Sequence, residues 1–246
     1  NRSLAVLRQI LNLAARKWRD EHGLTWLESA PMVTFQDWKD SRAPNPMTWD
    51  EQKRLFDALP EHLREMCLYK VNTGCREQEV CQLRWDWEFE IPELQTSVFI
   101  LPSHITKNAK EQVVVLNSVA RAVVNRQRGK HPERVFTYKG RPTNTINNSC
   151  WKRIRKEVGM EATRLHDMRH TTGRRLRAAG VSVETRKDIL GHEGGNITTH
   201  YSVPEIQELI DAVEKIAFEP THSTPSLTVI RVGGSRKTPV REIKKA

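Results

Sequence analysis

Three polar segments of this 246-residue sequence carry the residue types needed to cleave a phosphodiester bond. Cleavage without a metal ion or an activated water requires a nucleophile, an acid for the leaving oxygen, and cations around the transition state. Tyr201 is the candidate nucleophile. Because an unperturbed tyrosine has a pKa of about 10, its hydroxyl needs cationic neighbours or a base to react at neutral pH. The sequence should therefore contain those neighbours elsewhere.

The segment from Arg164 to His170 places His166 and Arg169 three residues apart in a predicted helix. Both side chains would lie on one helical face, where they could address the same phosphate. An arginine fork matches two phosphate oxygens, and a histidine beside it can exchange a proton near neutral pH. The same spacing is also common on polar helix surfaces, so this pair alone does not define a site.

The segment from Thr73 to Val80 places Arg76 directly after a glycine turn, at the start of another predicted helix. Glu79 follows three residues later, and a carboxylate at that distance can fix the direction of the guanidinium. An ordinary surface salt bridge has the same spacing.

The third segment is Leu-Gly-His at 190–192, with Tyr201 nine residues after the histidine. The intervening residues are polar and include two glycines, which would let the tyrosine reach into a site. A lone tyrosine more often packs half-buried against a core.

The order of these motifs resembles that of the tyrosine recombinases, the phage-type integrases, over about residues 47–218. In that family two arginines, two histidines, a lysine on a β-hairpin and a tyrosine form the catalytic site. Each has a match in this sequence: Arg76, Lys107, His166, Arg169, His192 and Tyr201, with Glu79 as a partner of the first arginine.

This resemblance implies that the two arginines clamp the scissile phosphate, while His192 binds a nonbridging oxygen and His166 helps to manage the tyrosine proton. It also implies that Lys107, between the second and third predicted strands, protonates the leaving 5′ oxygen. Lys110 in the same segment is the alternative acid. Tyr201 would form a 3′-phosphotyrosine and release a 5′ hydroxyl, with no cofactor and no metal.

The elements that position these residues are predicted to be mainly helices with one small antiparallel β-sheet, an α+β fold resembling the catalytic fold of that family. Strands are expected at 87–91, 98–101 and 113–116, and helices at 48–59, 61–72, from 76, 119–128, 144–158, 166–179, 183–190 and 204–218. The last helix could dock on a neighbouring protomer or pack on its own domain.

Three regions are expected along the chain. Residues 1–40, with an amphipathic helix at 3–18 and a proline-containing linker, are interpreted as the remnant of an upstream helical core-binding domain. We expect residues 47–218 to form the catalytic domain and residues 219–246, which are rich in Ser, Thr and Pro, to form a basic, flexible tail. Because the sequence opens at Asn1 inside a predicted helix, we interpret it as part of a longer protein.

A net charge of +10 and an isoelectric point near 9.7 indicate a polyanionic partner. Residues 151–190 hold eleven bases against five acids, interleaved with the motifs above. The resemblance implies double-stranded DNA recombination sites as the partner, a tetramer on DNA, and accessory DNA-bending proteins. The four cysteines lack metal-ligand spacing and no long apolar run exists, so we expect reduced thiols in an intracellular protein away from membranes. The resemblance implies the cytoplasm of a prokaryotic host, at its nucleoid.

Two alternatives remain open from the residues. The pattern of helix, Gly180 turn and helix at 166–190 also suits a helix-turn-helix DNA reader without chemistry. A type IB topoisomerase would use similar tyrosine chemistry to relax supercoils. A helix-turn-helix module would give Tyr201 no role. The spacing from Leu-Gly-His to Tyr201 favours the recombinase over the topoisomerase.

Overall fold

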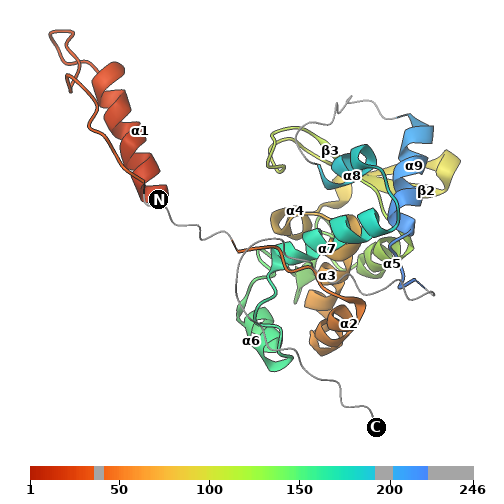
Figure 1. Cartoon of the computed structure of the whole chain (residues 1–246). Helices are drawn as coiled ribbons and strands as arrows, with labels where there is room; N and C mark the ends of the chain where they lie inside the picture. The colour runs from red at the N-terminus through yellow and green to blue at the C-terminus, as the bar shows by residue number, and fades with distance from the viewer. Residues whose placement is uncertain (36–41, 192–201, 221–246) are drawn as a thin grey trace. The chain divides into compact units, whose positions relative to one another are not determined.

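The computed structural model describes residues 1–35, 42–191 and 202–220, which divide into two compact units, 1–43 and 44–246 (Figure 1). In the first unit, α1 (Arg2–Arg16) is followed by a turn that the Asp20 carboxylate holds by accepting from the N–H groups of His22 and Leu24. The rings of Trp18 and Trp26 pack with their centroids 5.3 Å apart. None of the described helices is long and apolar enough to cross a membrane.

The second unit is built around α3 (Glu61–Thr73), of which nine of the thirteen residues are buried. This helix contacts both α5 (Ser118–Gln127) and α7 (Leu165–Ala178). Ahead of it, α2 (Trp49–Ala58) begins with a capping box, in which Thr48 Oγ1 accepts from the N–H of Glu51 and the Glu51 carboxylate accepts from the N–H of Thr48. The capping box fixes the start of α2, whereas α3 begins after Pro60 without a side-chain cap.

The strands β1 (Glu88–Ile91), β2 (Thr96–Leu101) and β3 (Gln112–Val114) form an antiparallel sheet in that order. Successive side chains on a strand point to opposite faces, so Val98 and Phe99 enter two different hydrophobic clusters. Phe99 joins the cluster around α3 and α5, and Val98 joins the cluster under α8 (Val183–Leu190) and α9 (Val203–Glu214). The small sheet thus lies between two layers of helices.

The prediction of a mainly helical α+β fold is confirmed. The predicted helices at 48–59, 61–72, 119–128, 166–179 and 183–190 agree with the structure to within one residue at each end, and the short α4 (Glu77–Cys81) lies where a helix was expected. The remaining elements are the 3-10 turns η1 (Trp85–Trp87) and η2 (Pro92–Leu94) and the hairpin of β4 (Thr137–Tyr138) and β5 (Arg141–Pro142). That hairpin was not predicted, because each strand has only two residues.

The predicted helix over 144–158 is wrong at its start. The observed helix, α6 (Ser149–Glu157), begins five residues later, where the Asn148 side chain accepts from the N–H of Trp151. The Glu77 carboxylate accepts from the N–H groups of Ile146 and Asn147 and so binds the preceding segment in a non-helical conformation. A contact 69 residues away in sequence therefore decides where the helix begins.

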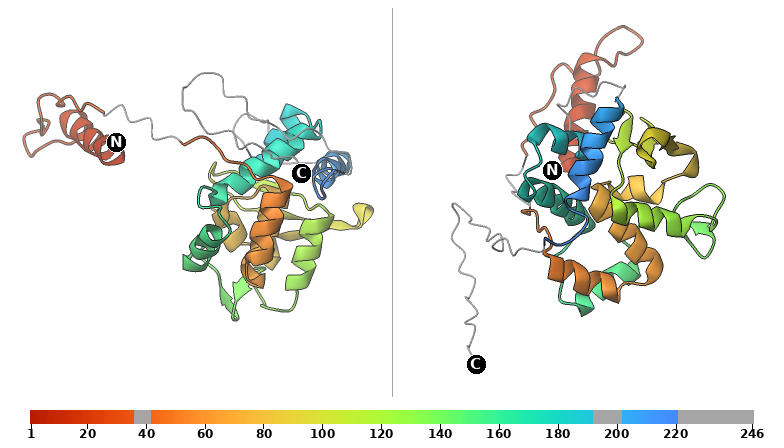
Figure 2. Two further views of the ribbon diagram at one scale, coloured as in Figure 1. Left: turned by 60° about the horizontal axis from the view of Figure 1, so that its bottom comes forward. Right: turned by 90° about the vertical axis from the view of Figure 1, so that its right-hand side faces the viewer.

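The last described helix, α9, ends at Glu214 rather than at 218 and packs against its own unit. It contacts α8 and η2, as the blue helix in Figures 1 and 2 shows. Glu214 Oε2 accepts from the N–H of Ser118 at 2.8 Å, and Asn117 Nδ2 donates to the carbonyl of Val213 at 3.1 Å. Of the two positions expected for this helix, the structure shows packing on its own domain.

Candidate active site

Arg76 is positioned by the turn that joins α3 to α4. Gly74 ends α3 in the left-handed conformation, with φ 74°, and its N–H donates to the carbonyl of Lys70 at 2.9 Å. A Cβ atom at this position would lie 2.6 Å from Leu190 Cδ2. Glycine therefore serves both the backbone conformation and the close packing against α8. Arg76 then caps the start of α4.

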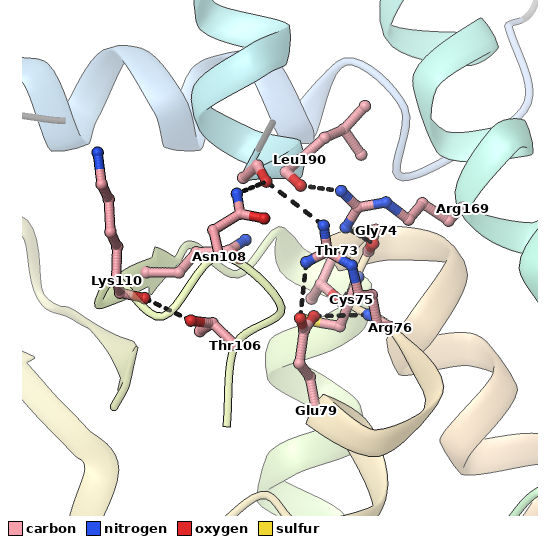
Figure 3. A network of polar contacts seen from close by, with 12 residues as sticks. Thr73, Gly74, Cys75, Arg76, Glu79, Thr106, Asn108, Lys110, Arg169 and Leu190 are labelled. Carbon is pink, nitrogen blue, oxygen red and sulfur yellow. Dashed lines mark hydrogen bonds and ion pairs between the residues drawn. The ribbon is translucent and has the colours of Figure 1, made fainter. Parts of the chain in front are cut away.

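A buried carboxylate holds the guanidinium of Arg76. Glu79 is 1% exposed, and its Oε1 lies 2.8 Å from Arg76 Nη1. Its other oxygen accepts from the backbone N–H of Arg76 at 2.6 Å. Figure 3 shows the Arg76 guanidinium between Glu79 and the end of α8. The carboxylate therefore fixes both ends of the arginine, its backbone and its charged group.

Arg169 reaches the same turn from α7. It is 4% exposed, and its Nη1 donates to the carbonyl of Gly74 at 2.8 Å while its Nη2 donates to the carbonyl of Leu190. Burial, and after it the charge of Arg76, lowers the pKa of Arg169 to about 10. Arg169 therefore stays protonated at neutral pH, close enough to Arg76 for the two charges to repel.

The C-terminal end of α8 is where the two arginines meet (Figure 3). The last carbonyls of a helix lack partners within the helix and carry the negative end of its dipole, so they attract cations and N–H donors. Here the carbonyls of residues 189–191 accept from four side chains that come from three other segments. The donors are Arg76, Asn108, Gln112 and Arg169.

Gly191, which follows α8, is the last residue that the structure describes before residue 202. It has φ 55°, and a Cβ atom there would collide with the Gln112 side chain. His192 and Tyr201, two of the predicted site residues, lie outside the described residues. The structure thus holds the chain beside both arginines up to the residue before His192.

His166 lies on the first turn of α7, three residues before Arg169. Its ring packs edge-on against that of His170, with centroids 4.7 Å apart. Although the side chain reaches the surface, partial burial lowers the pKa of His166 from its ordinary value, and the neighbouring His170 lowers it further. A neutral imidazole at pH 7 is favoured, and a neutral imidazole can accept a proton.

The two candidate lysines lie in the loop that joins β2 to β3, as predicted, and both side chains are exposed. Thr106 Oγ1 donates to the carbonyl of Lys110 at 2.6 Å, which closes the base of the loop. Asn108, next to Lys107, donates from Nδ2 to the carbonyl of Gly191 at 3.1 Å. In Figure 3 the Lys110 side chain points away from both guanidiniums. The loop is therefore tied to the end of α8 through Asn108.

Three residues around this site were missed by sequence reasoning: Lys70, Asn108 and Gln112. Lys70 is 1% exposed and donates from Nζ to the carbonyl of Cys75 at 2.5 Å. Its one sequence signal is a charge inside the apolar stretch 66–71. The two amides look like ordinary loop and strand residues, because their acceptors lie more than seventy residues away in sequence.

The arrangement suits an anion. Lys70, Arg76 and Arg169 lie around one turn with the Glu79 carboxylate, so these four groups carry a net positive charge. Among the residues that the structure describes, no group of three or more His, Cys, Asp or Glu side chains could hold a metal ion. The basic side chains of Lys70, Arg76 and Arg169 supply positive charge that could stabilise a phosphate at this turn.

Sequence comparison finds relatives over most of the chain. The profile of the phage integrase family matches residues 45–208. The integrase of Salmonella phage P22 is 27% identical over 215 residues, which cover 81% of this chain and 52% of that protein. A tyrosine recombinase XerC-like protein of Caldanaerobacter subterraneus subsp. tengcongensis is 27% identical over 187 residues, which cover 61% of this chain and 48% of that protein. The chain spans about half the length of these relatives.

Structural comparison finds the same fold in DNA complexes. A lambda integrase dimer bound to a COC' core site has a TM-score of 0.58 at 14% identity, covering 91% of this chain and 61% of that one. The XerH site-specific recombinase in a post-cleavage complex with a palindromic difH substrate has a TM-score of 0.57 at 16% identity, covering 83% of this chain and 62% of that one. At this level of identity the likeness concerns the fold.

Proposed function

Because the chain belongs to the phage integrase family, we propose that it is the catalytic part of a site-specific recombinase that cleaves and rejoins DNA through a 3′-phosphotyrosyl intermediate. The observation that carries this proposal is the convergence of Arg76 and Arg169 on the end of α8, directly ahead of His192. Two guanidiniums fixed on one point suit the nonbridging oxygens of a single phosphate.

The two arginines keep donors for that phosphate. A guanidinium has five N–H groups, and the hydrogen bonds described above use only part of this capacity in Arg76 and Arg169. Preorganised donors of this kind stabilise the charge that develops as the phosphate becomes pentacoordinate, and losing one typically slows a reaction by about 100- to 1,000-fold. The buried Glu79 would keep the Arg76 guanidinium in the same direction while negative charge builds up on the phosphate.

The remaining roles concern the movement of protons. Tyr201 would attack the phosphate, His166 would help to accept its proton, and His192 would bind a nonbridging oxygen. The lowered pKa of His166 supports its part, because the neutral ring is the form that accepts. Lys107 would protonate the leaving 5′ oxygen, and its loop position beside Asn108 places it on the segment that is tied to the arginine site.

A helix-turn-helix reader accounts less well for these contacts. α7 and α8 do contact each other across the Gly180 turn, where φ is 75°. However, α7 is packed into the core through Met168, Arg169 and Leu176, and the end of α8 is bound by side chains from other segments. A non-catalytic DNA-binding module has no need of a buried arginine beside a second, partly exposed one, so the contacts favour the enzyme.

The proposed function also implies a DNA substrate, an assembly on that DNA and a cellular location. The substrate would be double-stranded DNA recombination sites, on which a tetramer would assemble with help from accessory DNA-bending proteins, in the cytoplasm of a prokaryotic host at its nucleoid. The DNA-bound lambda integrase dimer and XerH complexes support a DNA partner. Residues 1–40 would belong to an upstream core-binding domain, and the net +10 charge of the chain suits a polyanion.

Covalent trapping tests this function. The Tyr201→Phe variant is used to select bound sequences from a random duplex pool, and the selected site is rebuilt as a nicked suicide substrate. We expect wild type to form an SDS-resistant protein–DNA adduct and Tyr201→Phe to form none. Tyr138→Phe, which alters a tyrosine that is exposed on the β4–β5 hairpin, is the matched control and should form the adduct normally.

Three outcomes would contradict the proposal. If wild type binds the selected site as well as Tyr201→Phe does but forms no adduct, the enzyme claim fails and the DNA reader is favoured. If Tyr201→Phe still forms the adduct, another side chain is the nucleophile. Efficient relaxation of supercoiled DNA that lacks the selected site would instead favour the topoisomerase.

A further inference from the structure

Lys70 is a buried cation for which the proposed chemistry has no role. It lies in α3, the central helix, and is 1% exposed. Taking an ammonium group out of water is unfavourable unless the group is paired or hydrogen-bonded, and an apolar side chain would fill a helix core at less cost. Burial, together with the charge of Arg169, lowers the pKa of Lys70 to about 8. The group therefore still carries its charge at neutral pH.

The ammonium of Lys70 is aimed at one peptide group. Its Nζ donates to the carbonyl of Cys75 at 2.5 Å, and the N–H on the other side of that peptide belongs to Arg76. This N–H donates to Glu79 Oε2 at 2.6 Å, while Glu79 Oε1 binds the guanidinium of Arg76 at 2.8 Å. A cation and a carboxylate thus hold opposite edges of the peptide plane from which the Arg76 side chain starts.

We propose that Lys70 is a positioning residue for Arg76, which acts by orienting and polarising the Cys75–Arg76 peptide. This inference rests on the proposed function, in which Arg76 binds the scissile phosphate. A peptide whose carbonyl is bound by an ammonium has a stronger N–H donor, so the contact to Glu79 is strengthened and both ends of Arg76 are held more firmly. Lys70 itself does not touch the DNA.

The charge of Lys70 has a second consequence. Glu79 offsets part of the charge of Arg76, because the two form an ion pair. With Lys70 and Arg169 included, the four groups carry a net charge of +2, which matches the two negative charges of a pentacoordinate phosphorane formed from a diester and a tyrosinate. Without Lys70 the net charge would be +1, and the same buried carboxylate would weaken the field at the phosphate.

The variant Lys70→Met tests this role, because it keeps an unbranched side chain, shorter by one atom, and removes the ammonium. Glu65→Met is the matched control: Glu65 is also a buried charged residue of α3, but its carboxylate faces Arg126 on α5 and not the turn before α4. We expect single-turnover cleavage of the suicide substrate to fall by about 10- to 100-fold in Lys70→Met, the range typical of residues that orient a functional group. DNA binding should change much less.

Three further measurements separate positioning from general damage to the fold. In the Arg76→Ala background, Lys70→Met should cause little additional loss, because residues that act through one another are not additive. On a scissile methylphosphonate, which lacks one negative charge, the defect of Lys70→Met should shrink. Hydrogen exchange at the amide of Arg76 should become about tenfold faster in Lys70→Met than in Glu65→Met, because a weakened Glu79 contact protects it less.

The outcomes are distinguishable from those of the function itself. If wild type forms an adduct and Lys70→Met cleaves at the wild-type rate, the inference fails while the proposed function stands. Additive losses with Arg76→Ala, or equal losses in Glu65→Met, would reduce Lys70 to a structural residue. If wild type forms no adduct, the exchange measurement still decides: unchanged exchange at the Arg76 amide overturns the proposed orientation.

Discussion

Gly74→Ala is the substitution that tests most directly how α3, α4 and α8 are held together. Gly74 has φ 74°, a conformation that costs an L-residue with a Cβ about 1–2 kcal/mol. The added Cβ would also lie 2.6 Å from Leu190 Cδ2, and Leu190 is a buried residue that must shift to make room. Overpacking of this kind costs about 1–3 kcal/mol. We therefore expect the free energy of unfolding to fall by about 2–5 kcal/mol in Gly74→Ala.

Gly129→Ala provides a control in the same chain. Gly129 has φ 78°, and a Cβ built there would meet nothing within 4 Å. It therefore carries the backbone cost without the contact, and the difference between the two variants in urea unfolding measures the contacts of the added Cβ, of which the one with Leu190 is the tightest. Cleavage should fall in Gly74→Ala only, because Leu190 carries the carbonyl that Arg169 binds. Equal destabilisation of the two variants, or normal cleavage by Gly74→Ala, would refute this account of the turn.

Two further predictions concern protons. Because the pKa of His166 is lowered in the folded protein, the unfolded chain binds a proton more readily there, so stability should rise as pH increases up to about 6.5 and then level off. His166→Asn should flatten the change in urea midpoint between pH 5.5 and pH 7.5, and an unchanged slope would contradict this. Lys107→Ala should lose cleavage of an ordinary 5′ bridging oxygen but keep cleavage of a 5′ phosphorothiolate, whose leaving group needs no proton. Equal loss on both substrates would remove Lys107 as the acid, and Lys110→Ala is the control.

Local signals in the sequence predicted the elements well. The capping-box spacing of Thr48 and Glu51 and the glycine turn before Arg76 each act within a few residues, and each is seen in the structure. The start of α6 was misplaced, because Glu77 binds the backbone ahead of it from a distant part of the sequence. A single sequence contains no signal for such a contact.

In the candidate site, too, the sequence predicted residues within motifs but not the contacts between distant segments. Motif order and spacing indicated Arg76 and Arg169, and the structure brings both to the end of α8. The sequence motifs could not indicate that Lys70 is buried close to both arginines, or that Asn108 shares the carbonyl of Gly191 with Arg76. Gly191 lies 83 residues from Asn108 and 115 residues from Arg76 in the sequence. Both contacts therefore depend on how α8 packs and not on a local sequence pattern.

The lowered pKa values of Lys70 and Arg169 have a common physical cause that connects stability to function. Both cations are buried near a third, and both give up part of their hydration without a full set of opposite charges. An unbound site of this kind is held together at a cost, which the surrounding core must offset. A phosphate between the guanidiniums would supply the missing negative charge and reduce the repulsion between them. Binding of DNA should therefore stabilise this part of the fold, and most strongly at the turn from Thr73 to Arg76, because that turn is where the three cations meet.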